Sequence, residues 1–332
     1  MKQISILFAL GGLALGTGVV GWFGFSRVAA AMLSVGWSGL IILAACQFVL
    51  FGILGLAWYA ILPRRSGLLW VMTWGRMVRD SAANCLPFTL MGGIAAGARS
   101  VASQGIGWPQ AIGSSIVDVT AEFLGQIAFV ALGLVLLVMR VPDSGLAVPL
   151  AIGLALAVAI GAAFVSLQLG AGRIFRALGG KIAADRFAGA SRHVDRLQAE
   201  LTGLYAHSGR LALGAAIHLL GWIGTGVVAW IAFRLLGADI GLGSVLALEA
   251  LLQVLLTAAF LVPGGIGVQE AGYASIGAAF GLPPEISLGV SLLRRGRDLA
   301  LGIPILLVWQ ITEARQAMRG PLAMRRAEKQ QG

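Results

Sequence analysis

Two apolar stretches of this chain, far apart in the sequence, are each interrupted by proline and paired glycines. The first interruption contains Pro87, Gly92 and Gly93, and the second is the run Val-Pro-Gly-Gly-Ile at 262–266. Proline breaks a helix, and lipid cannot satisfy the backbone polar groups that a broken helix exposes. Such breaks are tolerated at membrane depth only where they line a protected cavity, so the repeated pair predicts a transport-type membrane architecture.

The composition agrees with a polytopic membrane protein. Apolar residues make up 58% of the 332 positions and charged residues only 11%, whereas a soluble domain has roughly 25% charged residues. The net charge is +10, but the basic residues fall between apolar stretches rather than on one solvated face, so no nucleic-acid partner is expected. The cysteines and histidines are scattered and form no catalytic or zinc motif, so we expect no metal, cofactor or catalytic residue. His218 stands alone on an apolar span, which favours a packed core side chain over a ligand.

A transmembrane helix needs roughly 20 apolar residues, and six stretches have this length. They are 4–24, 37–62, 110–139, 145–169, 211–236 and 286–309. The first stretch resembles the start of a signal peptide, but its length favours a retained helix. The two broken regions, 80–106 and 245–281, are each predicted to be a re-entrant hairpin that dips into the bilayer and returns.

Basic residues predict the orientation, because they concentrate in cytoplasmic loops. With both termini in the cytoplasm, most Lys and Arg residues, Arg76 and Arg79 among them, fall inside, and only Arg27, Arg140 and Arg234 fall outside. In this layout the first hairpin opens to the cytoplasm and the second to the exterior, which predicts two inverted repeats. The predicted parts of this single membrane domain, 1–332, are repeats at 37–139 and 211–309, a basic loop at 170–210 and a cytoplasmic tail at 310–332. We expect the loop to be either one or two amphipathic helices on the inner membrane surface or a solvated linker.

Charged residues follow each break inside an apolar span. Their spacing places each set on one helix face. The first set is Asp118, Glu122 and Gln126, and the second is Arg294, Arg297 and Asp298. A charge at the bilayer centre costs about 2.5–3.5 kcal/mol on insertion scales, so these groups need partners. We predict that the two sets pair across the repeat interface and line a cavity that binds an anionic head group. The alternative is that they only hold the helices together.

The glycine breaks add a second predicted element of the site. A helix that begins after paired glycines presents free N–H groups and a positive dipole end, which suit a phosphate. The residues predicted to form or flank these tips are Asn84, Pro87, Gly92, Gly93, Arg99, Pro263, Gly264, Gly265, Gly267 and Glu270. We expect Glu270 and the glycine tips to grip or gate the bound molecule.

The order of these motifs resembles the transmembrane region of the lysylphosphatidylglycerol synthase family. The run Pro-Gly-Gly-Ile-Gly-Val-Gln-Glu-Ala at 263–271 is the most specific part, and Asn84-x-x-Pro87 and Val117-Asp118 agree in order. In that family the membrane region is regarded as a lipid flippase, and a separate soluble domain transfers aminoacyl groups. The chain ends soon after its last span, so we expect no synthase activity. The motifs look closer to the stand-alone branch associated with bacterial hopanoid biosynthesis.

The predicted function is a flippase or scramblase-like transporter in the bacterial inner membrane, and its cargo is an anionic phospholipid or a hopanoid-related lipid. One alternative is a membrane enzyme or an accessory subunit of lipid biosynthesis. Another is a proton-coupled carrier of a small solute, with Asp118 and Glu122 as proton sites. The expected partners are membrane lipids, with lipid-biosynthesis enzymes and a second copy of the chain as further candidates.

Overall fold

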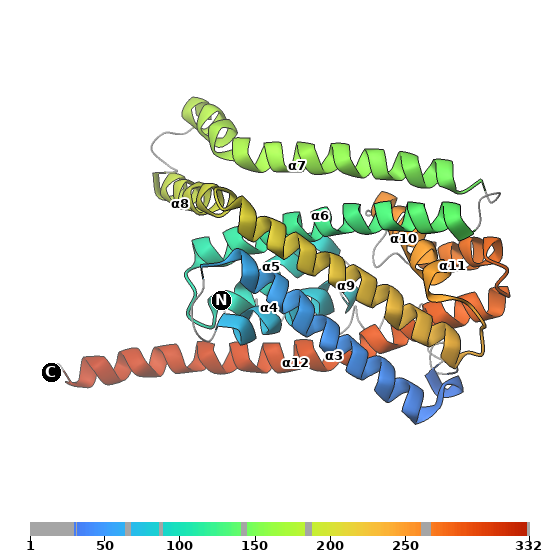
Figure 1. Cartoon of the computed structure of the whole chain (residues 1–332). Coiled ribbons are helices and arrows are strands. Elements are labelled where there is room, and N and C mark those ends of the chain that lie inside the picture. The colour runs from blue at the N-terminus through green and yellow to red at the C-terminus, as the bar shows by residue number, and fades with distance from the viewer. Residues whose placement is uncertain are drawn as a thin grey trace.

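The computed structural model describes residues 30, 32–63, 68–85, 89–140, 145–182, 188–259 and 267–330, whose secondary structure is helical with no strand among them (Figure 1). Side chains are described over the same ranges except at 89–91, 169–194 and 317–330. The helices are α3 (Gly36–Ile61), α4 (Leu68–Cys85), α5 (Thr89–Ala102), α6 (Trp108–Arg140), α7 (Ala147–Ile182), α8 (Ala188–Tyr205), α9 (Ser208–Leu235), α10 (Leu242–Ala258), α11 (Val268–Ala279) and α12 (Pro284–Gln330). The predicted all-α class is confirmed for these residues.

Four segments are long and apolar enough to cross a membrane. They are α3, α6, α9 and residues Ala147–Gln168 of α7. These segments correspond to the predicted spans 37–62, 110–139, 145–169 and 211–236. The predicted span 4–24 lies outside the described residues, and 286–309 lies inside α12, where the charged residues from Arg294 to Asp298 interrupt the apolar sequence.

The outer surface of the bundle is apolar, as a lipid environment requires. Helix α7 lies at the edge of the bundle (Figure 1), and its residues Val148, Ile152, Leu156 and Ile160 are each more than half exposed. Their spacing of four residues places them on one face. In water such a stripe would be an aggregation site, whereas in a bilayer it is a lipid contact.

Helices α3 and α9 pack against each other, α6 lies beside α9, and α12 runs along the edge of the bundle opposite α7 (Figure 1). The short helices form two packed pairs, α4 with α5 and α10 with α11. The α4–α5 pair lies towards the end of the molecule where α8 lies, and the α10–α11 pair lies at the opposite end (Figure 1). Each half of the chain thus runs as a long helix, a short pair and a long helix.

Both predicted breaks separate two helices. Residues 86–88 lie between α4 and α5, and 260–266 lie between α10 and α11; both segments, with Pro87, Pro263, Gly264 and Gly265, are outside the described residues. The predicted start of the first broken region, residue 80, was wrong. Helix α4 already begins at Leu68, so residues that were expected in a cytoplasmic loop are helical.

Close packing of glycines explains the position of α5. The prediction that a helix begins after Gly93 was wrong, because α5 begins at Thr89 and contains both Gly92 and Gly93. A methyl group on Gly93 would lie 2.8 Å from the carbonyl oxygen of Arg79 in α4, whereas Gly92 has open space around it. Gly93 therefore lets α5 pack directly on the backbone of α4.

The predicted loop 170–210 is largely helical, since α7 continues to Ile182 and α8 follows it. The buried side chains of Leu201 and Leu204 in α8 pack in a cluster with Trp58 and Ala111. The hydroxyl of Tyr205 hydrogen-bonds Thr120 of α6 at 2.7 Å. Helix α8 is therefore packed onto the end of the bundle by its apolar face.

Candidate functional site

Charged side chains of α4 and α6 meet inside the bundle and form what we name the first charge cluster. Its members are Arg76, Arg79 and Asp80 of α4, Asp118 and Glu122 of α6, and His218 of α9. Arg79 contacts Asp118 at 2.7 Å and Glu122 at 2.6 Å. Two arginines and two carboxylates thus form a cyclic set of charge-assisted hydrogen bonds, the strongest type in proteins.

The centre of the first charge cluster is shielded from the surroundings, whereas Glu122 and Asp80 at its margin are 19% and 20% exposed. Arg76 and Arg79 are 3% and 5% exposed, and Asp118 and His218 are fully buried. Arg76 donates to Glu122 at 2.9 Å and, through Nε, to Asp80 at 3.0 Å. The remaining oxygen of Asp118, Oδ1, lies 2.9 Å from Nε2 of His218. Every carboxylate oxygen of Asp118 and Glu122 therefore has a partner within the protein.

These contacts correct two predictions. Asp118 and Glu122 were expected to pair with Arg294 and Arg297 across the repeat interface, but their partners are the arginines of α4. Arg76 and Arg79 were assigned to a cytoplasmic loop, because arginine in a weakly apolar segment is typical of loops. Inside the bundle Asp118 and Glu122 compensate the charges of the two arginines, which lowers the free-energy cost of burying the guanidinium groups.

A second charge cluster joins α10, α11 and α12. Its members are Glu249, Glu270, Tyr273, Arg294, Arg295, Arg297 and Asp298. Arg294 donates to Glu249 at 3.0 Å, and the hydroxyl of Tyr273 donates to the other oxygen of Glu249. Arg297 bonds its neighbour Asp298 at 2.7 Å. The side chain of Arg294 is 20% exposed, whereas those of Arg76 and Arg79 in the first cluster are 4% and 6% exposed, so its guanidinium group is the more accessible one.

Glu270 has a structural task in the second charge cluster. Its Oε2 accepts a hydrogen bond of 2.8 Å from the backbone N–H of Gly267, which precedes α11, and its Oε1 lies 3.3 Å from Arg295. Gly267 has a φ of +77°, a conformation that favours glycine. Glu270 thus caps α11, and the predicted role of gripping a ligand remains a prediction.

A cleft lies beside the second charge cluster, between α3, α9, α11 and α12. The space within it and at its open side is about 300 Å³, of which about 20 Å³ admits the centre of a water-sized molecule. The lining residues are Leu43, Thr225, Val228, Ala229, Ala232, Tyr273, Val290, Leu293, Arg294 and Arg297. Its walls are therefore mostly apolar, and two guanidinium groups lie at its polar side. This combination suits an amphiphile with a negatively charged end.

Three further predicted residues lie outside the cleft lining. Gln126 donates a hydrogen bond of 2.8 Å to Thr257 and so links α6 to α10. Arg99, on the exposed side of α5, bonds Glu313 of α12 at 2.9 Å. Asn84 is exposed on α4. Gln126 and Arg99 therefore join the two halves of the chain.

Sequence reasoning missed Arg76, Arg79, His218 and Tyr273 as site residues. A signal existed for the arginines, because Arg76, Arg79 and Asp80 are spaced three and four residues apart and share a helix face. No local signal marks His218, because its partner Asp118 is 100 residues away. Among the side chains that the structure describes, no group of His, Cys, Asp and Glu has the arrangement of a metal site.

The apolar helices that could cross a bilayer, with ion pairs enclosed between them, define a multi-pass membrane protein. The profile of the family described as "Lysylphosphatidylglycerol synthase TM region" matches residues 9–305. The chain therefore belongs to this family, which confirms the resemblance of its motifs. Comparison with curated proteins and with solved structures gave no match.

Proposed function

We propose that this protein moves an amphiphilic lipid between the two leaflets of the bacterial inner membrane, and that the cleft binds its anionic head group. The observation that carries the proposal is the joint lining of the cleft by apolar side chains and by Arg294 and Arg297. Guanidinium groups recognise phosphate and carboxylate groups through paired hydrogen bonds. The apolar walls suit the hydrocarbon adjoining such a head group.

The arrangement of the helices supports the same proposal. The two packed short-helix pairs lie at opposite ends of the long helices (Figure 1), as inverted repeats with re-entrant hairpins would require. In this proposal both termini face the cytoplasm, and the cargo is an anionic phospholipid or a hopanoid-related lipid. Membership of a family whose model covers a lipid synthase's membrane region favours a lipid over a small solute. The protein acts as a transporter rather than as an enzyme.

The test is translocation of fluorescent phospholipids in vesicles that contain the purified protein. Arg297→Gln removes one guanidinium from the cleft, and loss of a charge-assisted hydrogen bond of about 1.5–3 kcal/mol should slow anionic lipid by about tenfold or more. A zwitterionic lipid without net charge should be affected less. Arg234→Gln is the matched control, because Arg234 pairs with the exposed Asp239 at the surface.

Three outcomes would contradict the proposal. One is equal translocation with and without the protein for every lipid, hopanoid-related lipids included. The second is unchanged anionic-lipid transport in both Arg297→Gln and Arg294→Gln. The third is the recovery of a chemically modified lipid from the vesicles, which would indicate an enzyme.

A further inference from the structure

His218 is an unusual member of the first charge cluster, because one of its ring nitrogens is buried without a partner. The residue is 0% exposed. Its Nε2 lies 2.9 Å from Oδ1 of Asp118, and its Nδ1 has no hydrogen-bond partner among the described residues. Buried polar atoms are rarely left unsatisfied, and such an exception calls for a physical explanation.

The charges around His218 do not balance while the imidazole is neutral. The cluster holds two arginines and three carboxylates, Asp80, Asp118 and Glu122. The sum is one net negative charge in a membrane-embedded interior, where an uncompensated charge is costly. One added proton would make the cluster neutral. Asp118 and Glu122 each accept hydrogen bonds from both arginines and Asp80 accepts one from Arg76, whereas Nδ1 of His218 has no partner among the described residues and so offers a free site for the added proton.

The other helices packed against α9 do not supply the missing charge at His218. Helix α3 contributes only Cys46 and Tyr59 as titratable side chains. Glu249 of α10 and Arg294 of α12 bond each other, and so do Arg297 and Asp298. Arg295 bonds Glu270. The charged residues of α8, at the beginning of α9, are Asp195, Arg196 and Glu200 among its described side chains.

Helix α9 joins His218 to the cleft. One turn beyond His218, the indole N–H of Trp222 donates to the carbonyl oxygen of Glu122 at 3.3 Å, so two successive turns of α9 bond α6. Two turns beyond His218, Thr225 begins the face of α9 that lines the cleft. A change in the contact between His218 and Asp118 therefore shifts the same rigid element that forms one wall of the cleft.

We propose that the imidazole of His218 is a proton-binding site, and that proton binding there couples lipid movement to the proton gradient across the membrane. In the protonated state Nε2–H donates to Asp118 and the cluster is neutral, which holds α9 against α6. Release of the proton leaves the net negative charge and weakens this contact, so that α9 can move relative to α6. The coupling rests on the proposed transport function, whereas the proton site itself does not.

The first experiment detects proton binding at His218 and does not depend on transport. Nuclear magnetic resonance of the full-length protein with isotope-labelled histidine follows the three imidazoles, His193, His207 and His218, through a pH titration. His193→Gln and His207→Gln each remove one signal, so His218 is assigned by elimination in folded protein. A change in the His218 resonances that marks proton binding to the imidazole is expected during the titration. Resonances of His218 that do not respond to pH while the protein stays folded would overturn the proposal.

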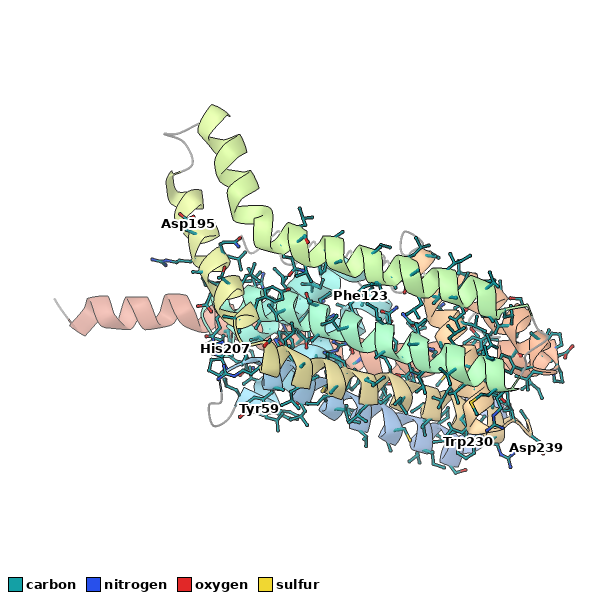
Figure 2. All side chains as sticks on the ribbon, turned by 45° about the horizontal axis from the view of Figure 1, so that its top comes forward. Tyr59, Phe123, Asp195, His207, Trp230 and Asp239 are labelled. Carbon is teal, nitrogen blue, oxygen red and sulfur yellow. The ribbon has the colours of Figure 1, made fainter. Side chains whose placement is uncertain are left out.

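The second experiment measures the coupling between proton binding and lipid movement. Vesicles with an imposed pH difference are given a fluorescent anionic lipid, and one proton per lipid should shift the steady-state leaflet ratio by about tenfold per pH unit. His218→Gln keeps a side chain that can bond Asp118 but cannot take a proton, and its ratio should stay near one. His207→Gln is the control, since His207 lies at the end of the bundle (Figure 2) and should retain the shift.

The outcomes separate the two proposals. A pH-driven shift that persists in His218→Gln, or one that is lost only in Asp80→Asn, would overturn the role of His218. A wild-type protein that moves lipid equally with and without the pH difference would also overturn it. A wild-type protein that moves no lipid would contradict the transport function, and the resonance titration would then still decide the proton site.

Discussion

The two charge clusters use the same chemistry in opposite arrangements. In the first, the short helix α4 carries arginines and the long helix α6 carries the carboxylates. In the second, the short helix α10 carries Glu249 and the long helix α12 carries Arg294. Both arginines and Asp118 of the first cluster are buried, with Glu122 19% exposed at its margin, whereas Arg294 of the second cluster is 20% exposed and lines the cleft.

The difference between the two clusters indicates where a head group can bind. The carboxylate oxygens of Asp118 and Glu122 are already occupied by Arg76, Arg79 and His218, so the first cluster offers little to a ligand unless it opens. In the second cluster Arg294 and Arg297 are paired with Glu249 and Asp298, and both also border a cleft with apolar walls. We therefore assign the stability of the bundle mainly to the first cluster and binding to the second. The following predictions test this division, beginning with the largest effect.

Asp118→Ala should cause the largest loss of stability. It removes the acceptor that Arg76, Arg79 and His218 share, so the two arginines keep only Glu122 in common and His218 loses its hydrogen-bond partner. Breaking a buried ion pair costs about 3–5 kcal/mol. Thermal unfolding of the detergent-solubilised protein measures this effect. Asp239→Ala is the control, because Asp239 is exposed at a helix connection (Figure 2). Equal melting of both variants would show that the first cluster does not stabilise the bundle.

Removal of Glu249 and Arg294, singly and together, should have a smaller effect on stability. Each single change to Gln leaves one charge unpaired in a partly open site, at a cost of about 1–3 kcal/mol. The double variant should recover part of that loss, and the double-mutant cycle gives the coupling energy. The same cycle for Arg79 and Asp118 should give a larger coupling. The reverse order would contradict the distinction between a more buried and a more exposed cluster.

Gly133→Ala tests the contact between the two halves of the chain. A methyl group there would lie 2.1 Å from Cβ of Ala250, so α6 and α10 would have to separate, at a cost of about 1–3 kcal/mol. Gly52→Ala in α3 is the control, because its added methyl group meets nothing within 4 Å. If Gly133→Ala proves more stable to unfolding than Gly52→Ala, the close contact between α6 and α10 is refuted.

Arg99→Gln should have the smallest effect. The side chain of Arg99 is 56% exposed and pairs with Glu313, and exposed ion pairs contribute about 0.2–1 kcal/mol. The loss should shrink further at high salt, because exposed charges are screened. An unfolding shift as large as that of Asp118→Ala, and unchanged by salt, would give Arg99 a role that its exposure does not suggest.

The sequence predicted the helices better than their pairing. Apolar length located α3, α6, α9 and the apolar part of α7, Ala147–Gln168, within a few residues. Pro87 and the Pro-Gly-Gly run at 263–265 located both separations between short helices, whereas Gly92 and Gly93 lie inside α5. The spacing of Asp118 and Glu122 predicted one shared face, and both do contact Arg76 and Arg79. These features are local, because helix periodicity and backbone chemistry determine them.

The sequence did not predict which charged residues pair with each other. Arg76 was assigned to a loop because charge rules treat arginine as a loop residue, and only the packing of α4 on α6 shows its compensation. His218 was correctly expected to be buried, but its bond to Asp118 depends on the register of α9 against α6. That register is determined by close contacts such as Gly125 against Ala215, which no single segment reveals.

The continuity of α12 has a mechanical consequence. The helix passes Arg297 at the cleft and continues without interruption to Gln330, beyond the ends of its neighbours (Figure 1). At 1.5 Å per residue, the tail reaches about 50 Å past the cleft. If α12 rotates by a few degrees about Arg297, its far end is therefore displaced by several ångströms. A probe on the tail would amplify the motion of the cleft wall into a readable displacement.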